Sequence, residues 1–266
     1  MPIEAETLCE IWTEEVLPAQ TPSQLYYLTP IGIGTPLVES LTSYISRLAT
    51  AHSVLPRTLV TKIILPHLER SHLYREEAPV YDHLTTFWKH SSVLNGTSGT
   101  AAIWVQTLEQ LTRCNELHSL TFLSFANAIS CRNLVRPIQA WCSMCYTEWR
   151  RTNQVVYQPL LWHFSAVTIC LGHQQQLHTK CPYCERTFHP LTSRSQPGYC
   201  SHCQSWLGVS PNRESKQKHM YEEKQHWVSA TVGNLLAEMP TLTKLPSLRT
   251  LPRIITTHVN SVLLTS

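Results

Sequence analysis

The sequence predicts a mainly α-helical chain: a helical head that contains a helix-turn-helix, two tandem modules with small β elements, and C-terminal helices. Three observations predict this class. Apolar residues recur at helical spacing through the first half of the 266-residue chain. Pairs of cysteine and histidine follow one another closely between residues 142 and 203. The 17 prolines outnumber the 8 glycines, which is typical of short, rigid connections.

Four pairs of metal-ligand residues, each with a two-residue gap, dominate the second half of the chain. The pairs are Cys142-x2-Cys145, Cys170-x2-His173, Cys181-x2-Cys184 and Cys200-x2-Cys203. Such a gap lets a tight turn aim both side chains at one point, and two pairs complete a tetrahedron around Zn²⁺. Because the pairs follow one another, we expect two structural zinc ions, one held by three thiolates and an imidazole and one by four thiolates. The spacings therefore predict zinc-ribbon or zinc-finger modules with small β elements.

Disulfides and a redox dithiol explain the same cysteines less well. The first residues have no cationic start and no long apolar core, so no signal peptide of a secreted disulfide scaffold is visible. A thioredoxin-like dithiol needs one Cys-x2-Cys near a βαβ pattern, not three in a row. Within the first site, His178 competes with His173 for the fourth ligand position, because both follow Cys170. His202 lies between two predicted ligands and is expected to face solvent.

The first 65 residues predict an arm and two helices. Residues 1–34 form an acidic arm that contains prolines. A helix is predicted over 36–52, starting at Thr35-Pro36, and a second over 57–65, ending at Pro66 because proline bars further regular helix. The apolar residues of both fall on one face: Leu37, Leu41, Tyr44, Ile45 and Leu48 in the first, and Leu59, Val60, Ile63 and Ile64 in the second. Helix, short turn and helix is helix-turn-helix geometry, which serves base readout, partner docking or plain packing.

The remaining segments complete the predicted organisation. The helical domain spans 35–140, with further helices around Tyr81–Trp88 and Ala101–Leu111 and one that Ser119 or Thr121 caps. The first zinc module spans 141–180, with a short helix at 157–162 and a strand at 166–169. The second spans 181–208. A C-terminal helical segment covers 209–266, with a polar helix from residue 216 to about 236 and an apolar segment from 254 to 264. A homodimer through these helices is left open.

The charge distribution argues against a strongly basic DNA clamp. Residues 1–38 carry five glutamates and no Lys or Arg, while the whole chain has a net charge of +3. Ligand thiolates offset the basic surplus of the zinc region, and tight nonspecific phosphate binding needs clustered Lys and Arg. Five scattered cations are candidates for nucleic-acid or partner contacts: Arg47, Arg57, Lys62, Arg150 and Arg151. No apolar run reaches the ~18 residues of a membrane span, and zinc thiolates imply a reducing compartment, hence the cytoplasm.

Several of these motifs together resemble the TniQ/TnsD family of transposon target-selection proteins. The segment 36–49, PLVESLTSYISRLA, is similar to the family's N-terminal helix G-E-S-L-x-S-W-L-x-R-L. The segment from Trp141 through the zinc-ligand pairs, which includes YQPLLW at 157–162, also resembles the family. The resemblance covers roughly residues 30–207. Val38 and Tyr44 depart from the family's glycine and tryptophan, and neither position is a predicted ligand.

The resemblance implies an adaptor rather than an enzyme. Members couple target recognition to a AAA+ ATPase that assembles on DNA and recruits the transposase. The short segment after the second zinc site favours the type used with RNA-guided, CRISPR-associated transposition, here with a Cascade-like effector and its guide RNA. Partners are then the ATPase, the effector and target DNA, with no membrane, in the bacterial cytoplasm at the nucleoid. The alternative is a sequence-specific DNA-binding protein, an attachment-site reader or transcription regulator, that uses the helix-turn-helix.

Overall fold

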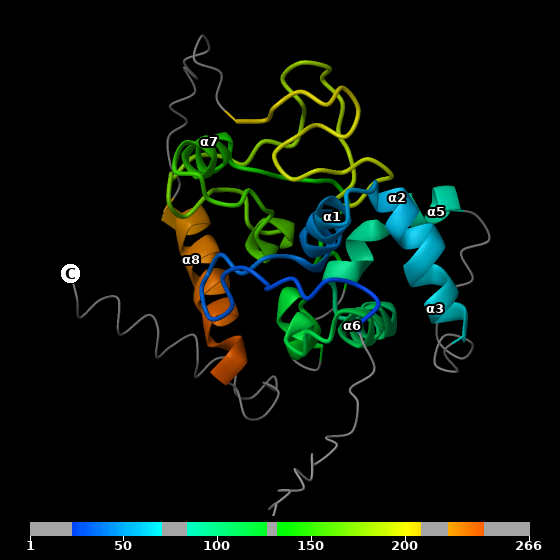
Figure 1. Cartoon of the computed structure of the whole chain (residues 1–266). Helices are drawn as coiled ribbons and strands as arrows, with labels where there is room; N and C mark the ends of the chain where they lie inside the picture. Colours follow the sequence, from blue (N-terminus) through cyan, green and yellow to red (C-terminus); the bar gives the residue numbers. More distant parts are fainter. Residues whose placement is uncertain (1–22, 71–83, 127–131, 209–222, 242–266) are drawn as a thin grey trace, which may run out of the picture.

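The computed structural model describes residues 23–70, 84–126, 132–208 and 223–241. Its fold is mainly helical, as predicted, and the β component in the described residues consists of isolated bridges. Helix α1 (Leu41–Ala51) lies in the middle of the view in Figure 1, between the segment of α2 and α3 and the segment of α7 and α8. The loops that carry the later cysteines lie above it. The described part contains no helix long and apolar enough to cross a membrane.

Helix α1 begins later than predicted. Ser40, not Thr35, is its N-cap: the Ser40 backbone is extended, and its Oγ accepts a hydrogen bond from the Ser43 backbone N–H at 3.3 Å. The residues before it do not continue the helix, because they form turns around Gly32 and Gly34 and Glu39 forms a bridge with Pro159. Four residues of the predicted apolar face, Leu41, Tyr44, Ile45 and Leu48, are fully buried in the helix, while Leu37 lies before the helix and is half-buried.

The second helix continues through the proline that was predicted to end it. Its parts are α2 (Pro56–Leu59), the π-helical η1 (Val60–Ile64) and α3 (Leu65–Arg70). In the π segment the Leu65 N–H donates to the Val60 carbonyl, five residues back. A wider turn placed directly before Pro66 changes the carbonyl positions with which the proline ring would clash in a regular helix. The prediction that Pro66 bars further helix was therefore wrong.

The middle of the head contains one long helix and several 3₁₀ turns. After α5 (Leu84–Lys89) and η2 (Ser91–Asn95), helix α6 runs over Gly99–Thr112 with Ser98 as its N-cap. The helix predicted after Ser119 is instead two 3₁₀ turns, η3 (Leu117–Leu120) and η4 (Leu123–Phe125), with Ile129 outside the described residues. The Thr121 hydroxyl donates to the His118 carbonyl and accepts from the Leu123 N–H, and such local bonds compete with a helix.

The C-terminal half is built from short elements. Helix α7 (Ser143–Arg151) follows Cys142, and η5 (Leu160–His163) replaces the predicted helix at 157–162. The predicted strand at 166–169 is reduced to one bridge between Ile169 and Gln176. Helix α8 (Glu223–Glu238) and η6 (Met239–Thr241) end the described chain, and α8 packs on η5. The expected start of that helix at residue 216 and the apolar segment 254–264 lie outside the described residues.

A single contiguous core joins the helical head to the cysteine-bearing segments. It extends from Leu25 to Met239 and includes Trp141, Trp162 and the thiols of the first site. Aromatic side chains pack inside it, with the Phe87 ring stacked on the Trp104 ring at a centroid distance of 5.1 Å. Fully buried aromatic side chains contribute the largest apolar areas of such a core. The first metal centre is therefore part of the main core, while the boundaries of the five predicted segments stay a prediction.

Candidate metal centres

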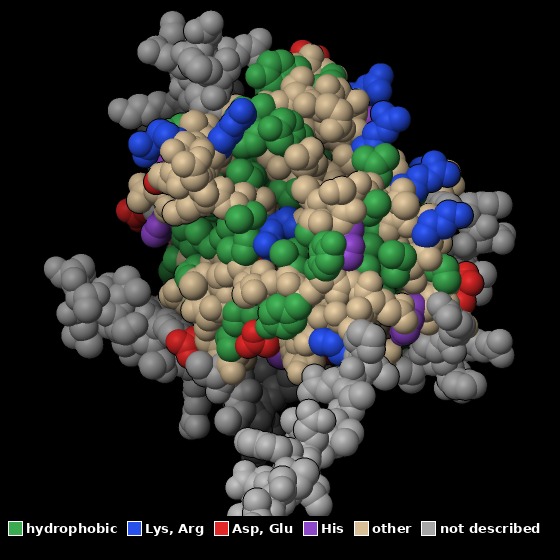
Figure 2. Space-filling model, viewed as in Figure 1, with side chains coloured by type: hydrophobic (Ala, Val, Ile, Leu, Met, Phe, Trp, Pro, Cys, Tyr) green, Lys and Arg blue, Asp and Glu red, His purple; other side chains and the backbone are tan. Residues whose placement is uncertain are grey.

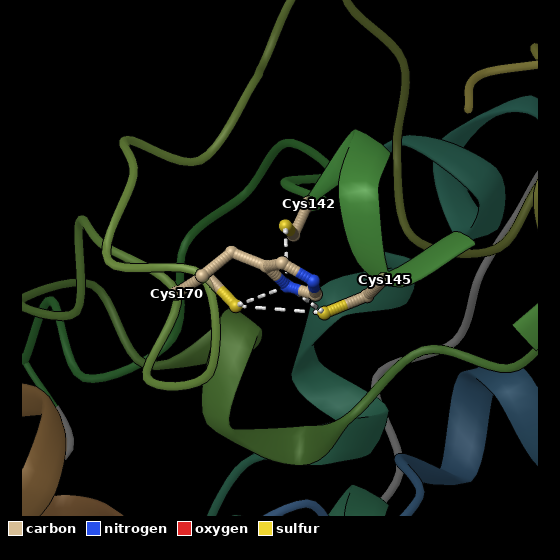
Figure 3. A group of neighbouring side chains, drawn as sticks. Cys142, Cys145 and Cys170 are labelled. Atoms are coloured by element: carbon tan, nitrogen blue, oxygen red, sulfur yellow. Dashed lines mark hydrogen bonds between the residues drawn. The ribbon is translucent and has the colours of Figure 1, made fainter. Parts of the chain in front are cut away.

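The first predicted ligand set comes together at the start of helix α7. The ligand atoms of Cys142, Cys145, Cys170 and His173 all lie within 4.8 Å of one another. Cys142 is the N-cap residue of α7 and Cys145 lies in its first turn, while Cys170 and His173 come from a tight turn. The three thiols point toward one another from these two segments (Figure 3). The positive end of a helix favours thiolates at this position.

Three of the four pairs have the same backbone geometry. At Cys170, Cys181 and Cys200, the carbonyl accepts a hydrogen bond from the residue four positions on, at 2.9 Å in each case. The cysteine N–H donates to the carbonyl five positions on, at 2.9 to 3.0 Å. The residue four positions after the first cysteine has a positive φ in all three turns, at Gln174, Glu185 and Gln204. The two-residue gap thus forms a repeated turn that aims both ligands inward, while the first pair uses a helix N-terminus instead.

The second ligand set is built from two of these turns. Cys181, Cys184, Cys200 and Cys203 also have ligand atoms within 4.8 Å of one another. This centre is less buried than the first, because Cys184 is half-buried and Cys203 is exposed. The turns are held to the head: the Arg57 N–H donates to the Ser193 carbonyl, and the Ser91 hydroxyl donates to the Leu191 carbonyl at 2.8 Å.

Both clusters have the dimensions of tetrahedral zinc sites. A Zn–S bond of about 2.3 Å separates neighbouring sulfurs by about 3.8 Å, and an imidazole ligand gives an S to N separation of about 3.6 Å. The sulfur atoms of Cys145 and Cys170 are 3.5 Å apart, and those of Cys181 and Cys203 are 3.7 Å apart. The His173 Nδ1 lies 3.2 to 3.7 Å from the three thiols of its set. Two structural zinc ions fit this protein, one in each cluster.

The protonation chemistry of the thiols agrees with cation sites. The neighbouring thiols of Cys142 and Cys170, together with burial, raise the pKa of Cys145. Hydrogen bonds from Cys142 and Cys145 lower the pKa of Cys170 to about 2. In the second cluster burial raises the pKa of Cys200 to about 12. Neighbouring thiols that are buried together resist joint ionisation, and a divalent cation bound among them would supply the charge that ionises them.

Glu148 is a partner of the first centre that the sequence analysis missed. Its Oε2 lies 3.4 Å from Nε2 of His173, the ring nitrogen that faces away from the thiols. A zinc-binding histidine commonly gives its second ring N–H to a carboxylate, which fixes its tautomer and orientation. The sequence carried a signal, because Cys145 and Glu148 are three residues apart on helix α7 and so share one face.

Replacing Glu148 with glutamine should weaken zinc binding at the first centre. Loss of such a carboxylate partner typically costs about 10–100-fold in metal affinity. Competition with a chromophoric chelator measures zinc release, and the variant should lose one of its two ions at a lower chelator concentration than the wild type. Glu69→Gln, an exposed change on α3, is the matched control. Equal release curves for all three proteins would contradict a role for Glu148.

The structure also separates the two histidine candidates. His178 is not in the cluster: its Nε2 lies 3.3 Å from the Ser143 Oγ, and its backbone bridges to Trp141. His173 is the histidine beside the thiols, which resolves the open alternative in its favour. His202 is exposed, as expected, and its Nε2 lies 3.2 Å from the Thr187 carbonyl oxygen.

The five predicted contact cations have different environments. Arg57, Lys62 and Arg151 are exposed. Arg150 is exposed and its guanidinium lies 4.8 Å from the ring centre of Trp206. Arg47 is mostly covered, with 12% of its side chain exposed, and it pairs with the fully buried Glu39. Their contacts with nucleic acid or partners stay a prediction.

A buried polar network around Glu39 fixes helix α1 to the insert between the first two ligand pairs. The Ser43 hydroxyl donates to Glu39 at 2.8 Å and accepts from the Gln158 backbone N–H at 3.0 Å. The Ser40 N–H donates to the Gln158 carbonyl at 2.9 Å. Burial raises the pKa of Glu39 to about 7, and Arg47 and Ser43 oppose this rise. The Glu-Ser pair of the N-terminal helix motif therefore joins the head to the metal-binding half.

The chain combines a helical core with two clusters of four protein ligands each, and this defines a protein with structural zinc centres. Comparison with family models then identifies it more closely: the TniQ model matches residues 30–177, more than half of the chain, and the chain belongs to the TniQ family. The family is one of transposition-associated adaptors that act with other transposon proteins, as the sequence resemblance indicated. A search of curated proteins found no match.

Proposed function

We propose that the chain is a non-enzymatic adaptor that links an RNA-guided, Cascade-like target-recognition complex to a AAA+ transposition ATPase on target DNA. The observation that carries the proposal is the match to TniQ across the helical head and the first metal centre. The structure of the metal centres supports the proposal that the chain is not an enzyme. Four protein ligands close a structural zinc site and leave no position for water or substrate.

The rigidity of the molecule supports a connecting role. The metal-binding turns, helix α7 and the head share one core, so a partner bound at one end is held in a fixed orientation to a partner bound at the other. Transposition in the bacterial cytoplasm, at the nucleoid, is the setting that this proposal implies. A homodimer is compatible with it and is tested by the same experiment through the stoichiometry of the complex.

Reconstitution tests the proposal directly. Beads carrying target DNA are incubated with the effector and its guide RNA, the ATPase of the same transposon and the chain, and bound ATPase is measured. We expect efficient ATPase retention only when both effector and chain are present. A guide that does not match the DNA is the control. Retention of the same amount of ATPase without the chain would refute the adaptor role, and retention that needs the chain but not the effector would refute its RNA-guided form.

A second candidate is sequence-specific DNA binding by α1 and the second helix, which comprises α2, η1 and α3. The observation that favours it is the exposure of Arg57, Thr58 and Lys62 near the start of the second helix, where base-reading residues are found in helix-turn-helix proteins. This candidate predicts tight, site-specific binding of duplex DNA by the chain alone. The adaptor predicts weak, salt-sensitive binding that increases when the ATPase or effector is added.

A further inference from the structure

A pocket of about 400 Å³ lies where the head meets the second metal module. Helix α1 contributes Arg47, Thr50 and Ala51, and the chain after α7 contributes Val155 and Val156. The remaining walls come from the N-terminal segment of the described chain and from the second module, and they include Leu28, Pro197, Tyr199 and Trp206. In the view of Figure 2, Lys and Arg side chains are set among hydrophobic ones on the surface of the molecule.

The charge of the pocket is positive. Its lining contains Arg47 and Arg150 and no Asp or Glu. Arg47 is paired with Glu39 behind the wall. Arg150 forms no ion pair with a carboxylate of the described residues, and its guanidinium lies over the Trp206 ring. The pocket therefore offers one unpaired cation beside an apolar surface.

The wall beside Arg150 is rigid. Trp206 packs against two glycines, and a Cβ at Gly198 or Gly208 would lie 2.4 or 2.3 Å from the indole. Gly198 also has a φ of +84°, which side chains rarely adopt. Tyr199 meets the same indole edge-on at 5.2 Å. A preformed surface of this kind loses little entropy when a ligand binds.

The apolar surface continues outside the pocket. Val155 is 55% exposed although it lines the pocket, and Tyr26 is 61% exposed. Tyr26 stacks on His52 at the end of α1, directly after the lining residue Ala51. Exposed apolar residues that gather at one site, rather than singly, mark a binding surface.

The chain itself carries a segment with the complementary chemistry. Residues 4–17, EAETLCEIWTEEVL, contain five glutamates and no Lys or Arg. Leu8, Ile11 and Trp12 recur at the spacing of one helix face, which is the pattern of a helix that binds in an apolar groove. The described chain begins at residue 23, five residues before the lining residue Leu28. Residue 23 lies at most about 17–18 Å from Leu28 along five residue steps, and the six steps from residue 17 to residue 23 span up to about 20–22 Å, so the segment can reach the pocket.

We propose that this pocket binds acidic, apolar peptide and that residues 4–17 of the same chain occupy it, with Trp12 against the apolar wall and a glutamate beside Arg150. The inference does not depend on the adaptor proposal, since it concerns a contact within one chain. A nucleic acid fits less well, because phosphate binding needs clustered Lys and Arg, while this pocket offers one unpaired arginine among aliphatic residues.

Site-specific photo-cross-linking in the zinc-loaded, full-length chain tests the contact. Benzoylphenylalanine replaces Trp12, the chain is irradiated, and mass spectrometry maps the products. We expect cross-links within one chain to peptides that contain Val155, Val156, Tyr199 or Trp206. Arg150→Glu should lower their yield several-fold, because the glutamates of residues 4–17 then meet a negative charge in place of the arginine. High salt should lower the yield as well, because it screens the attraction between the glutamates and Arg150. Zinc content and circular dichroism check that each variant is folded.

Arg151→Glu is the matched control, because Arg151 is the exposed neighbour of Arg150 and does not line the pocket. It should leave the yield nearly unchanged. Cross-links scattered over the surface, or equal losses in both variants, would overturn the proposal. Products that join two chains would overturn its intramolecular form. If no cross-link reaches the pocket while Arg150→Glu weakens duplex DNA binding more than Arg151→Glu, the pocket is a nucleic-acid site and the proposal is wrong.

Discussion

Replacing Cys145 with serine is expected to unfold the protein as a unit. Cys145 is buried in the main core, in the first turn of helix α7. A serine hydroxyl binds zinc weakly, so three ligands remain around an incomplete tetrahedron. Structural zinc contributes about 10–16 kcal/mol of apparent folding free energy in zinc-finger peptides, which is comparable to the ~5–15 kcal/mol net stability of a typical domain. Metal analysis should give at most one zinc per chain, with loss of the near-ultraviolet dichroism of the buried tryptophans.

Cys184→Ser should have a more local effect. Cys184 is half-buried and belongs to the more exposed second centre. This variant should also lose one zinc ion, but the head should keep its dichroism while the coupling to partners is lost. Cys114→Ser is the control, because Cys114 is a buried thiol outside both clusters. It should keep two zinc ions. One zinc per wild-type chain would contradict the pairing of the ligands, and normal transposition by Cys184→Ser would contradict the role of the second centre.

The ligand sets could be predicted from the sequence because their geometry is local. A two-residue gap fixes each pair within one turn. The repeated turns at Cys170, Cys181 and Cys200 depend on hydrogen bonds between residues that are no more than five positions apart in the sequence. The buried face of α1 was predictable for the same reason, since it follows from the helical period alone. Local signals of this kind need no knowledge of the tertiary structure.

The features that sequence analysis missed depend on contacts between distant segments. Helix α1 starts at Leu41 because the residues before Ser40 pair with the segment around Gln158, more than one hundred positions away. The helix through Pro66 depends on a π turn that propensity alone does not predict. Glu148 had a local signal in its spacing from Cys145, but its partner His173 lies on another segment. The pocket requires four segments of the chain to meet.

Replacing Arg47 with methionine is expected to cost about 3–5 kcal/mol, the usual effect of removing one member of a buried ion pair. Glu39 has no exposed side-chain surface, so the variant leaves a buried carboxylate with only the Ser43 hydroxyl as a side-chain donor. Burying the Glu39 side chain without Arg47 costs less free energy when its carboxyl group is protonated and therefore neutral. The deficit should therefore be larger at pH 8 than at pH 5.5, as measured by urea unfolding of the zinc-loaded proteins.

The wild-type protein should show a weaker form of the same pH dependence. Burial raises the pKa of Glu39 from 4.5 to about 7, so the folded chain binds this proton more tightly than the unfolded chain does. The stabilisation from that proton is fully present below about pH 4.5 and is lost as the pH rises through about 7. Glu39→Gln removes the titrating group and should lose less stability than the wild type between pH 5 and pH 8. Zinc release also depends on pH, but it affects both proteins alike and cancels in their difference.

The double variant Glu39→Gln, Arg47→Met separates the pair from other effects of the two substitutions. If the ion pair holds α1 against the insert that carries Gln158, the double variant should recover much of the stability lost in Arg47→Met, because it no longer buries an unpaired carboxylate. Additive losses would show that Arg47 acts through packing rather than through Glu39. A pH dependence of Glu39→Gln equal to that of the wild type would show that another group titrates in this range. Either result would remove the electrostatic link between the N-terminal helix and the metal-binding half.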